Sequence, residues 1–220
     1  MNRIESITNM IDPCDKLADI GSDHAWLPIR AIQEKKVKYA YACDVAKGPL
    51  QAAKKNIDSL QLQEKITTVL SNGFDNVPKD IQCAVIAGMG CKTAIGILDK
   101  CDYLDHLNQI LVEVNNDVES FRKWISLQKY TIQKEKVIMD RGHDYICISF
   151  NTLPSNGYSE EDCVLGPYLR QHVGEEYLTY CAHKAEKLEF ILSKRNASDP
   201  TYEELKKRYV LFQNVLKEKK

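Results

Sequence analysis

The sequence contains no long apolar run and no excess of charge of either sign. No stretch approaches the roughly 20 apolar residues that a membrane-spanning helix needs, and Met1–Glu5 does not begin the apolar segment of a signal peptide. Lys and Arg number 30 against 31 Asp and Glu, which excludes a uniformly basic nucleic-acid-binding protein but allows a local basic surface. We therefore expect a cytoplasmic protein that does not associate with membranes.

Pairs of cysteines at C-x-x-C spacing are also missing, although the chain has eight cysteines. Cys43, Cys83 and Cys147 lie within apolar, strand-like runs, where free thiols behave as small hydrophobic side chains in a reducing compartment. A zinc site built from Cys101 and His106 would need further ligands from distant segments. The sequence therefore predicts neither a disulfide framework nor a metal site.

Strand-like and helix-like segments alternate over the first 150 residues, which is typical of an α/β domain with a parallel sheet, right-handed crossovers and helices on both faces. Two strand-like runs, 130–139 and 145–150, follow one another without a helix and predict an antiparallel pair. Ligands bind beyond the carboxyl ends of the strands in such sheets. We expect strands at 16–21, 39–45, 66–70, 83–87 and 110–114, and helices at 2–11, 25–33, 49–60, 92–98 and 118–126.

The pattern changes near Asn151, where the turn-forming segment Leu153–Gly157 begins and strand-like runs end. Two heptad-like apolar stripes follow and predict an antiparallel, coiled-coil-like helical hairpin, with Asp199 as the N-cap of its second helix and Pro200 in the first turn. We predict two domains, 1–152 and 153–220. The stripes consist of Leu178, Cys181, Ala185, Leu188 and Leu192, and of Tyr202, Leu205, Tyr209, Phe212 and Leu216.

Acidic and small residues follow the first two predicted strands. Asp19 and Gly21 belong to a turn that lacks the G-x-G-x-x-G pattern of dinucleotide sites. Asp44, followed by Val45, ends the second strand, where a carboxylate can hold both hydroxyls of a ribose. The alternative for Asp44 is a solvated acid at a strand end.

Asn72 and Gly73 follow the third strand, and Ala87 and Gly88 end the fourth. An Asn side chain can bind an adenine edge and Gly leaves room for the ring, but Asn-Gly is also a common turn. The glycines after the fourth strand allow a ligand close to the backbone, or else tight strand–helix packing. Together the four strand ends predict a nucleoside-shaped ligand without pyrophosphate, such as S-adenosylmethionine.

One segment makes the sequence recognisable. Asp19-Ile-Gly-Ser-Asp-His-Ala-Trp-Leu-Pro28 resembles the D-I-G-S-D-H-A-Y-L-P motif of the bacterial TrmK family, and the resemblance continues through Ala87–Gly90, His143–Ile148 and Gly166–Leu169. It implies a class I, Rossmann-like S-adenosylmethionine-dependent methyltransferase domain followed by a coiled-coil-like domain. The implied activity is methylation of N1 of adenine 22 in tRNA, with tRNA as the partner; no protein partner is implied.

Four positions depart from the family pattern. Asn72 replaces an acid, Asn115-Asn116 stands where Q-P-N is common, Trp26 replaces a Tyr and Cys91 replaces a Gly. Trp26 keeps a stacking face without a hydroxyl, and with Met89 it is a candidate substrate contact.

The implied reaction needs no strong base, because adenine N1 carries a free lone pair at neutral pH. The sequence also lacks the Asn/Asp-Pro-Pro-aromatic motif of enzymes that methylate exocyclic amines. A carboxylate near the base would stabilise the cationic product. The resemblance points to Asp23, with His24 and Asn115 as further candidates; alternatively, Asp23 is only the N-cap of the following helix and His24 only a structural residue.

RNA binding would require local positive charge. Residues 206–220 hold six basic side chains against one acid, and Lys206, Lys207 and Arg208 are the candidate RNA contacts. A solvated helix face is the alternative. Two other functions remain open at this point: a methyltransferase of the same fold that acts on a small molecule, and a non-catalytic RNA-binding adaptor.

Overall fold

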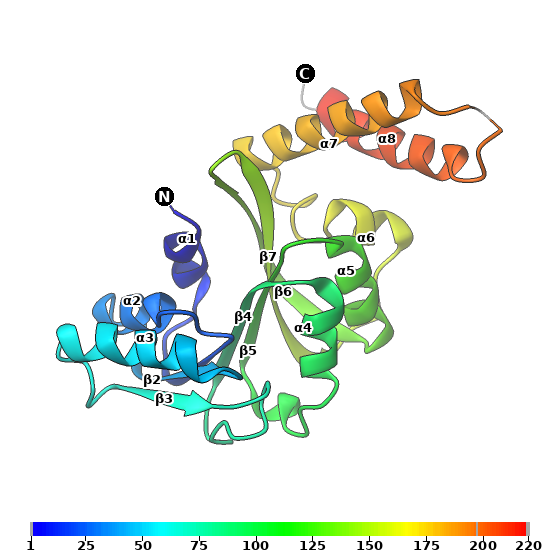
Figure 1. Ribbon diagram of the computed structural model, residues 1–220. Coiled ribbons are helices and arrows are strands. Elements are labelled where there is room, and N and C mark those ends of the chain that lie inside the picture. Colours follow the sequence, from blue (N-terminus) through cyan, green and yellow to red (C-terminus); the bar gives the residue numbers. More distant parts are fainter. Residues whose placement is uncertain (1, 197, 219–220) are drawn as a thin grey trace.

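The computed structural model describes residues 2–196 and 198–218 and is built on a seven-stranded mixed sheet (Figure 1). Every strand predicted from the sequence is present, and the fourth extends two residues further, to Met89. The strands are β1 (Cys14–Ile20), β2 (Val37–Asp44), β3 (Ile66–Leu70), β4 (Cys83–Met89), β5 (Gln109–Val114), β6 (Tyr130–Asp140) and β7 (His143–Pro154).

The strand order is β3-β2-β1-β4-β5-β7-β6. Strands β1 to β5 pair in parallel, whereas β7 runs antiparallel to both β5 and β6. The predicted α/β sheet with one antiparallel strand is confirmed. The carboxyl ends of β1, β2, β4 and β5 therefore meet at one edge of the sheet.

Helices cover both faces of the sheet because its central strands are apolar on both sides. In β4, Cys83 and Val85 pack toward the three helices within residues 3–59, whereas Ala84 and Ile86 pack toward the two helices within residues 91–127. A 3-10 helix, η1 (Leu104–His106), and a short α-helix, α6 (Glu160–Leu165), were not predicted. The two layers are α1 (Arg3–Met10), α2 (Trp26–Gln33) and α3 (Lys47–Ser59) on one face, and α4 (Cys91–Leu98) and α5 (Val118–Leu127) on the other.

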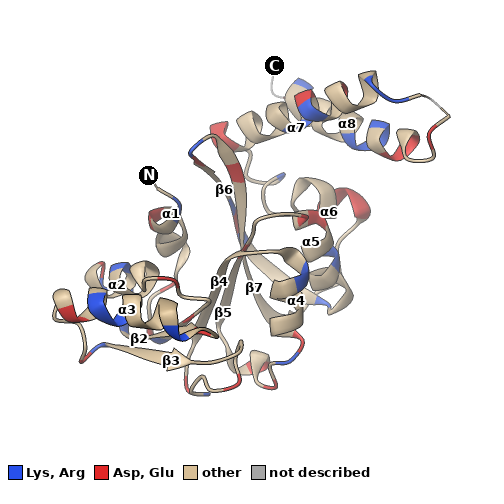
Figure 2. Cartoon of the chain, viewed as in Figure 1, with Lys and Arg blue, Asp and Glu red and all other residues tan. Residues whose placement is uncertain are grey.

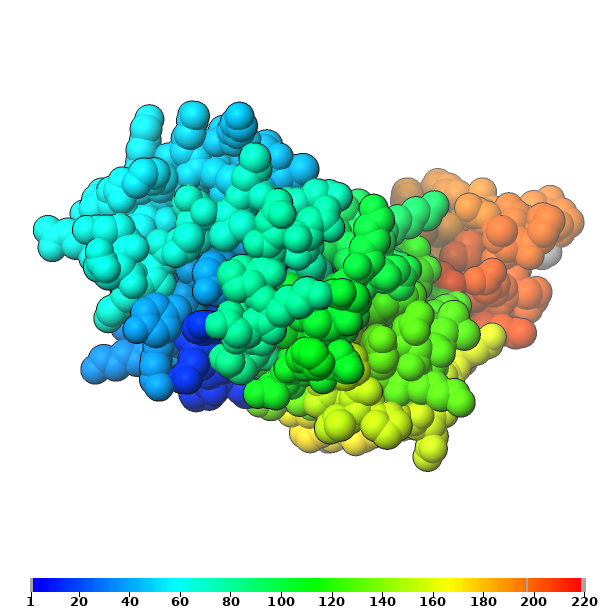
Figure 3. Space-filling view, turned by 90° about the horizontal axis from the view of Figure 1, so that it is seen from below, coloured from blue at the N-terminus to red at the C-terminus, as the bar shows by residue number. Residues whose placement is uncertain are grey.

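The predicted helical hairpin is present as α7 (Glu175–Ser193) and α8 (Tyr202–Lys217). Figures 1 and 3 show it extending away from the body of the molecule. Its second helix begins later than predicted, since its N-cap is Thr201 rather than Asp199. Asp199 instead accepts a hydrogen bond of 2.8 Å from the backbone N–H of Thr201 and pairs with Arg195.

The hairpin shares its buried interior with the sheet. Strand β7 continues to Pro154, so the predicted boundary between residues 152 and 153 lies inside a strand. The buried rings of Tyr177, Tyr180 and Phe212 join the same apolar cluster as Phe121 of α5. A cut near residue 152 would therefore interrupt a strand and expose part of this core.

All eight cysteines are free thiols. Among the described residues, no helix is long and apolar enough to cross a membrane. The same part of the chain holds no group of three or more His, Cys, Asp or Glu side chains that could bind a metal ion.

Candidate functional site

The turn after β1 is tightly curled at the carboxyl edge of the sheet. Gly21, His24 and Ala25 have positive φ angles of 81°, 62° and 58°, a conformation that costs free energy for the two residues with side chains. The carbonyl of Cys43 accepts hydrogen bonds of 2.8 Å from the N–H groups of both Gly21 and Ser22. The turn is thereby attached to the end of β2.

A carboxyl at the end of β1, Asp19, and a hydroxyl in the turn, Ser22, are both buried here. Burial raises the pKa of the Asp19 carboxyl to about 6; the nearby Ser22 hydroxyl opposes this shift, and the charge of Asp44 adds to it. The Ser22 hydroxyl oxygen is itself buried without a hydrogen bond among the described residues. Because unsatisfied buried polar groups are costly, the arrangement suits a ligand that carries both positive charge and hydrogen-bonding groups.

Asp44 lies at the end of β2, beside this turn. Its Oδ1 accepts a hydrogen bond of 2.8 Å from the N–H of Ala46, which orients the carboxylate and leaves Oδ2 available to a ligand. The Asp44 carbonyl accepts the N–H of Ser71 after β3, so the ends of β2 and β3 are joined. The neighbouring Val45 is 70% exposed.

The Asn72–Gly73 turn follows β3. The amide nitrogen of Asn72 is 3.3 Å from a carboxylate oxygen of Asp75, and the residue is exposed. Gly73 has a φ of 60°, and a Cβ there would lie 3.0 Å from the side chain of Ile97. Gly73 is thus needed for the turn and its packing on α4.

The β4 strand ends in a bulge between Ala87 and Met89. Gly88 has a φ of 77°, and its carbonyl accepts a hydrogen bond of 2.7 Å from the side-chain amide of Asn115, after β5. The side chain of Met89 lies over Gly21, since a Cβ on that glycine would be 2.2 Å from the Met89 methyl carbon. The structure therefore brings Met89 to the turn after β1 and gives Asn115 a contact that fixes the β4 end.

Glu113 belongs to this region and was missed in the sequence analysis. It is fully buried in β5, its Oε2 accepts the N–H of Gly88 at 3.1 Å, and Arg3 Nη1 lies 3.5 Å from the same oxygen. Its second oxygen has no partner among the described residues. Burial raises the pKa of Glu113, and Arg3 and the Gly88 N–H oppose that shift. The sequence signal that could have identified Glu113 is an acidic residue within the otherwise apolar run 110–114.

Asp23 and His24 are exposed at the same edge of the sheet. The N-cap of α2 is Ala25, with no side-chain capping bond, so the alternative role of Asp23 as an N-cap is wrong. The Asp23 carboxylate instead lies 3.4 Å from His24 Nε2, with 70% of its side chain exposed. Trp26 is 47% exposed and lines a depression with Ile4 and residues of α2.

The predicted basic contacts on α8 lie among acids. Arg208 pairs with Glu119 at 3.0 Å and with Glu204 at 2.8 Å. Lys206 and Lys207 line a depression together with five glutamates, and Figure 2 shows both signs of charge along the hairpin. Lys219 and Lys220 lie outside the described residues. The structure gives α8 no concentrated positive surface.

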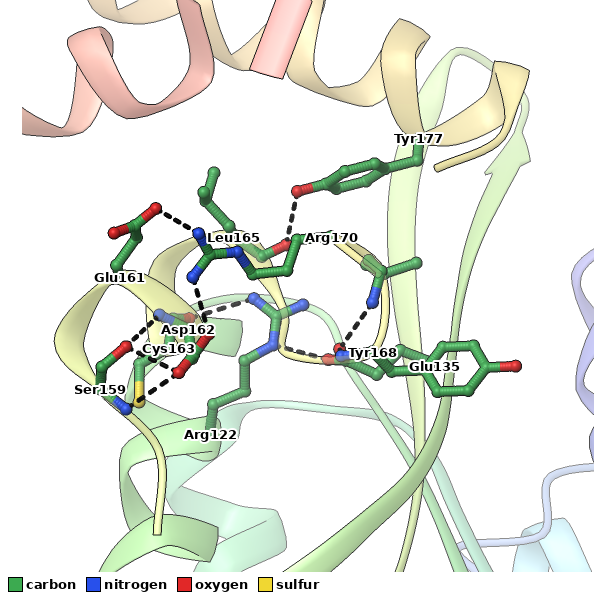
Figure 4. A network of polar contacts seen from close by, with 11 residues as sticks. Arg122, Glu135, Ser159, Glu161, Asp162, Cys163, Leu165, Tyr168, Arg170 and Tyr177 are labelled. Atoms are coloured by element: carbon green, nitrogen blue, oxygen red, sulfur yellow. Dashed lines mark hydrogen bonds and ion pairs between the residues drawn. The ribbon is translucent and has the colours of Figure 1, made fainter. Parts of the chain in front are cut away.

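A buried ion pair anchors the segment that leads into the hairpin. Arg122 of α5 and Glu135 of β6 are both fully buried, with Nε and Oε1 2.7 Å apart (Figure 4). Arg122 also donates to the carbonyls of Cys163 and Val164, and Glu135 accepts the N–H of Tyr168. The pair thus holds the chain between α6 and α7.

The segment between α6 and α7 begins Gly166-Pro-Tyr-Leu, and its first position requires glycine. Its φ is 93°, and a Cβ there would lie 2.7 Å from Arg122 Nη2 and 2.8 Å from Glu135 Oε2. Only glycine leaves room for the ion pair beneath the backbone. The motif therefore sets the direction in which the chain leaves for α7.

Comparison with known proteins gives one consistent result. The methyltransferase-domain family matches residues 1–148. The tRNA (adenine(22)-N(1))-methyltransferase of Bacillus subtilis is 28% identical over 145 residues, which cover 65% of this chain and 61% of that protein, less than two thirds of its length.

Solved structures match over almost the whole chain. TrmK of M. capricolum, in complex with S-adenosyl-homocysteine, has 29% identity and a TM-score of 0.84, with 98% of this chain and 96% of that chain covered. Sp1610 of Streptococcus pneumoniae, in complex with S-adenosyl-L-methionine, has 28% identity and a TM-score of 0.87, with 98% and 100% covered. The predicted fold, including the hairpin, is confirmed. The chain belongs to the methyltransferase-domain family, and over almost its whole length it is similar to TrmK, whose family motif its β1 segment resembles.

Proposed function

We propose that this protein transfers a methyl group from S-adenosylmethionine to N1 of adenine 22 in tRNA. The observation that carries the proposal is the carboxyl edge of the sheet, where the buried Asp19 carboxyl, the unpartnered Ser22 hydroxyl and Asp44 lie together in a chain of the TrmK family. The activity of the Bacillus subtilis relative supports the choice of substrate. A tRNA substrate also agrees with the cytoplasmic location expected from the sequence.

The residues present fit the proposed cofactor. Asp19 would pair with its ammonium group, Ser22 would bind its carboxylate, and the free oxygen of Asp44 would accept bonds from the ribose hydroxyls. Asn72 and Gly73 would face the adenine, with Val45, Gly21, Ala87 and Gly88 completing the contact surface. When bound, S-adenosylmethionine supplies a methyl group on a cationic sulfur.

The side chains at the β1 and β5 ends would then act on the substrate base. Adenine N1 attacks with its own lone pair and becomes cationic, so the Asp23 carboxylate would stabilise charge that develops during transfer. Asp23 would also accept a hydrogen bond from the exocyclic amine. His24 lies within 3.4 Å of Asp23 and would orient it, and Asn115 would hold the β4 end against the base.

The direct test is methylation of tRNA that lacks the modification. After incubation with S-adenosylmethionine, mass mapping of the tRNA should show one added methyl group on adenine 22. Methyl transfer to small metabolites but not to tRNA would identify a small-molecule methyltransferase instead. Tight tRNA binding without turnover, and without thermal stabilisation by S-adenosylhomocysteine, would identify an RNA-binding adaptor.

Cofactor affinity should depend on pH through Asp19. Without cofactor its pKa is about 6, and an ammonium partner favours the ionised form, so binding must release a proton below that pH. Affinity should be constant above pH 7 and about tenfold weaker at pH 5. Calorimetry with S-adenosylhomocysteine measures this, and Asp19→Asn should bind weakly at both pH values. An unchanged wild-type affinity at pH 5 would separate Asp19 from the ammonium.

Asp44→Ala should weaken S-adenosylhomocysteine binding at least about tenfold, because hydrogen bonds to a charged group are worth about 1.5–3 kcal/mol each. Asp15→Ala is the matched control: Asp15 is an exposed acid of β1 that pairs with Lys38 and lies toward the opposite edge of the sheet. Calorimetry should show wild-type affinity for the control. Equal affinities for the two variants would remove Asp44 from the site.

A further inference from the structure

A cavity of about 270 Å³ lies where the end of β5 meets the helical hairpin. Asn115 and Asn116 line it from the sheet, and Tyr180, Lys184 and Lys187 line it from α7. Figure 1 shows α7 beyond the upper ends of β5 and β7. Since Asn115 also contacts the end of β4 through the Gly88 carbonyl, the cavity adjoins the strand ends proposed to receive the substrate base.

Part of the lining of this cavity is apolar. Ile146, Tyr180 and Phe212 contribute to its lining, and the last two rings pack edge to face with their centroids 6.2 Å apart. Such a surface can cover a sugar or a base. Polar and charged residues also line the cavity, and a mixture of apolar and polar groups is the usual composition of a binding pocket.

Most charges around the cavity already have partners. Arg208 pairs with Glu119, and Asp144 lies 2.8 Å from His183 Nδ1. Asp117 accepts the N–H of Ser120 as the N-cap of α5. These contacts leave the two lysines of α7 as the cations that a ligand would meet.

Lys184 and Lys187 form no ion pair with any described carboxylate. The Lys184 ammonium instead lies 5.2 Å from the centre of the Tyr180 ring. Burial, reinforced by the positive charge of Lys187, lowers the pKa of Lys184, and the negative charge of Asp144 opposes that shift only in part. An anion placed between the two lysines would offset both the burial of the Lys184 charge and its repulsion by Lys187. On α8, by contrast, acids already surround the basic residues.

We propose that this cavity binds the sugar-phosphate backbone of the RNA substrate, with Lys184 and Lys187 holding one phosphate close to the target nucleotide. The inference rests on the proposed tRNA methylation and adds its backbone contact. Phosphate contacts fix the position of a nucleic acid, and structured RNA is bound largely through its backbone and shape. The apolar and aromatic lining residues favour a phosphate that carries a sugar over a free phosphate ion.

The test replaces both lysines with glutamine, which keeps their length and removes their charge. The dissociation constant of Lys184→Gln/Lys187→Gln for unmodified tRNA should rise about tenfold, and the slope of log K against log salt should become shallower by about 1–2. The KM for tRNA should rise in parallel. Affinity for S-adenosylhomocysteine and the single-turnover rate at saturating tRNA should stay within about twofold of wild type.

Lys206→Gln/Lys207→Gln is the matched control, because it removes the same charge from the other helix of the hairpin. It should bind tRNA nearly as well as wild type, as should Lys184→Arg/Lys187→Arg, which keeps the charge. Equal salt slopes for the two glutamine variants would overturn the inference. So would stabilisation of the wild type by inorganic phosphate together with unchanged tRNA binding in the variant, which would indicate a site for small anions.

The two proposals fail in different ways. RNA binding is measured without turnover, so a wild-type protein that binds tRNA through these lysines but does not methylate it would overturn the proposed activity and support the contact. Normal methylation by Lys184→Gln/Lys187→Gln at low tRNA concentration would support the proposed activity and overturn the proposed phosphate contact.

Discussion

Asp23→Asn is expected to lower the single-turnover rate of methyl transfer about 100-fold, by analogy with the loss of one preorganised electrostatic contact. Asparagine keeps the size of the side chain but removes the charge that would stabilise the cationic base. This interaction strengthens as charge develops, so tRNA and cofactor affinity should change only a few-fold. Stability should hardly change, because Ala25, not Asp23, is the N-cap of α2.

The chain contains a close control for this change. Asp105 also precedes a histidine, and its carboxylate lies 3.8 Å from His106 Nε2, with both side chains exposed. This pair lies before β5, near the amino end of that strand, so Asp105→Asn should leave the rate unchanged. Rapid-quench measurement at saturating tRNA and cofactor compares the two. A folded Asp23→Asn protein with a near wild-type rate would remove Asp23 from the chemistry.

The fold was predictable because its signals are local. Apolar runs marked the strands, and the lack of a helix between 139 and 145 marked the antiparallel β6–β7 pair. The exact start of α8 was not predictable. Asp199 accepts hydrogen bonds from the backbone N–H and the hydroxyl of Thr201 in the turn, so it does not cap the helix. The predicted domain boundary falls inside a strand, since the residues after Asn151 continue β7 as far as Pro154.

The site was predictable only in part, because its contacts join distant segments. The strand ends that carry Asp19 and Asp44 follow from the alternation of strands and helices. The sequence could not show that Arg208 pairs with Glu119, 89 residues away. Nor could it show that Lys184 forms no ion pair with any described carboxylate, which depends on how α7 packs against β6.

The placement of α7 depends on the Arg122–Glu135 pair, and breaking that pair should have the largest effect on stability. Arg122→Met leaves Glu135 as an unpaired buried charge, so the free energy of unfolding should fall by about 3–5 kcal/mol. Lys123→Met is the control on the same helix: it removes the half-exposed Lys123–Glu119 pair, which should be worth at most about 1 kcal/mol. Urea unfolding measures both changes, and a loss below about 1 kcal/mol in Arg122→Met would contradict the expected role.

The double variant Arg122→Met/Glu135→Leu separates charge from backbone anchoring. Where an ion pair contributes only charge, apolar replacement of both partners is often neutral or stabilising. Here the pair also holds the carbonyls of Cys163 and Val164 and the N–H of Tyr168, and each buried group left without a partner costs about 1–3 kcal/mol. The double variant should therefore remain at least about 2 kcal/mol less stable than wild type. Full recovery of stability would show that the pair does not anchor this segment, and that the position of α7 is determined by the apolar packing around Tyr177, Tyr180 and Phe212 alone.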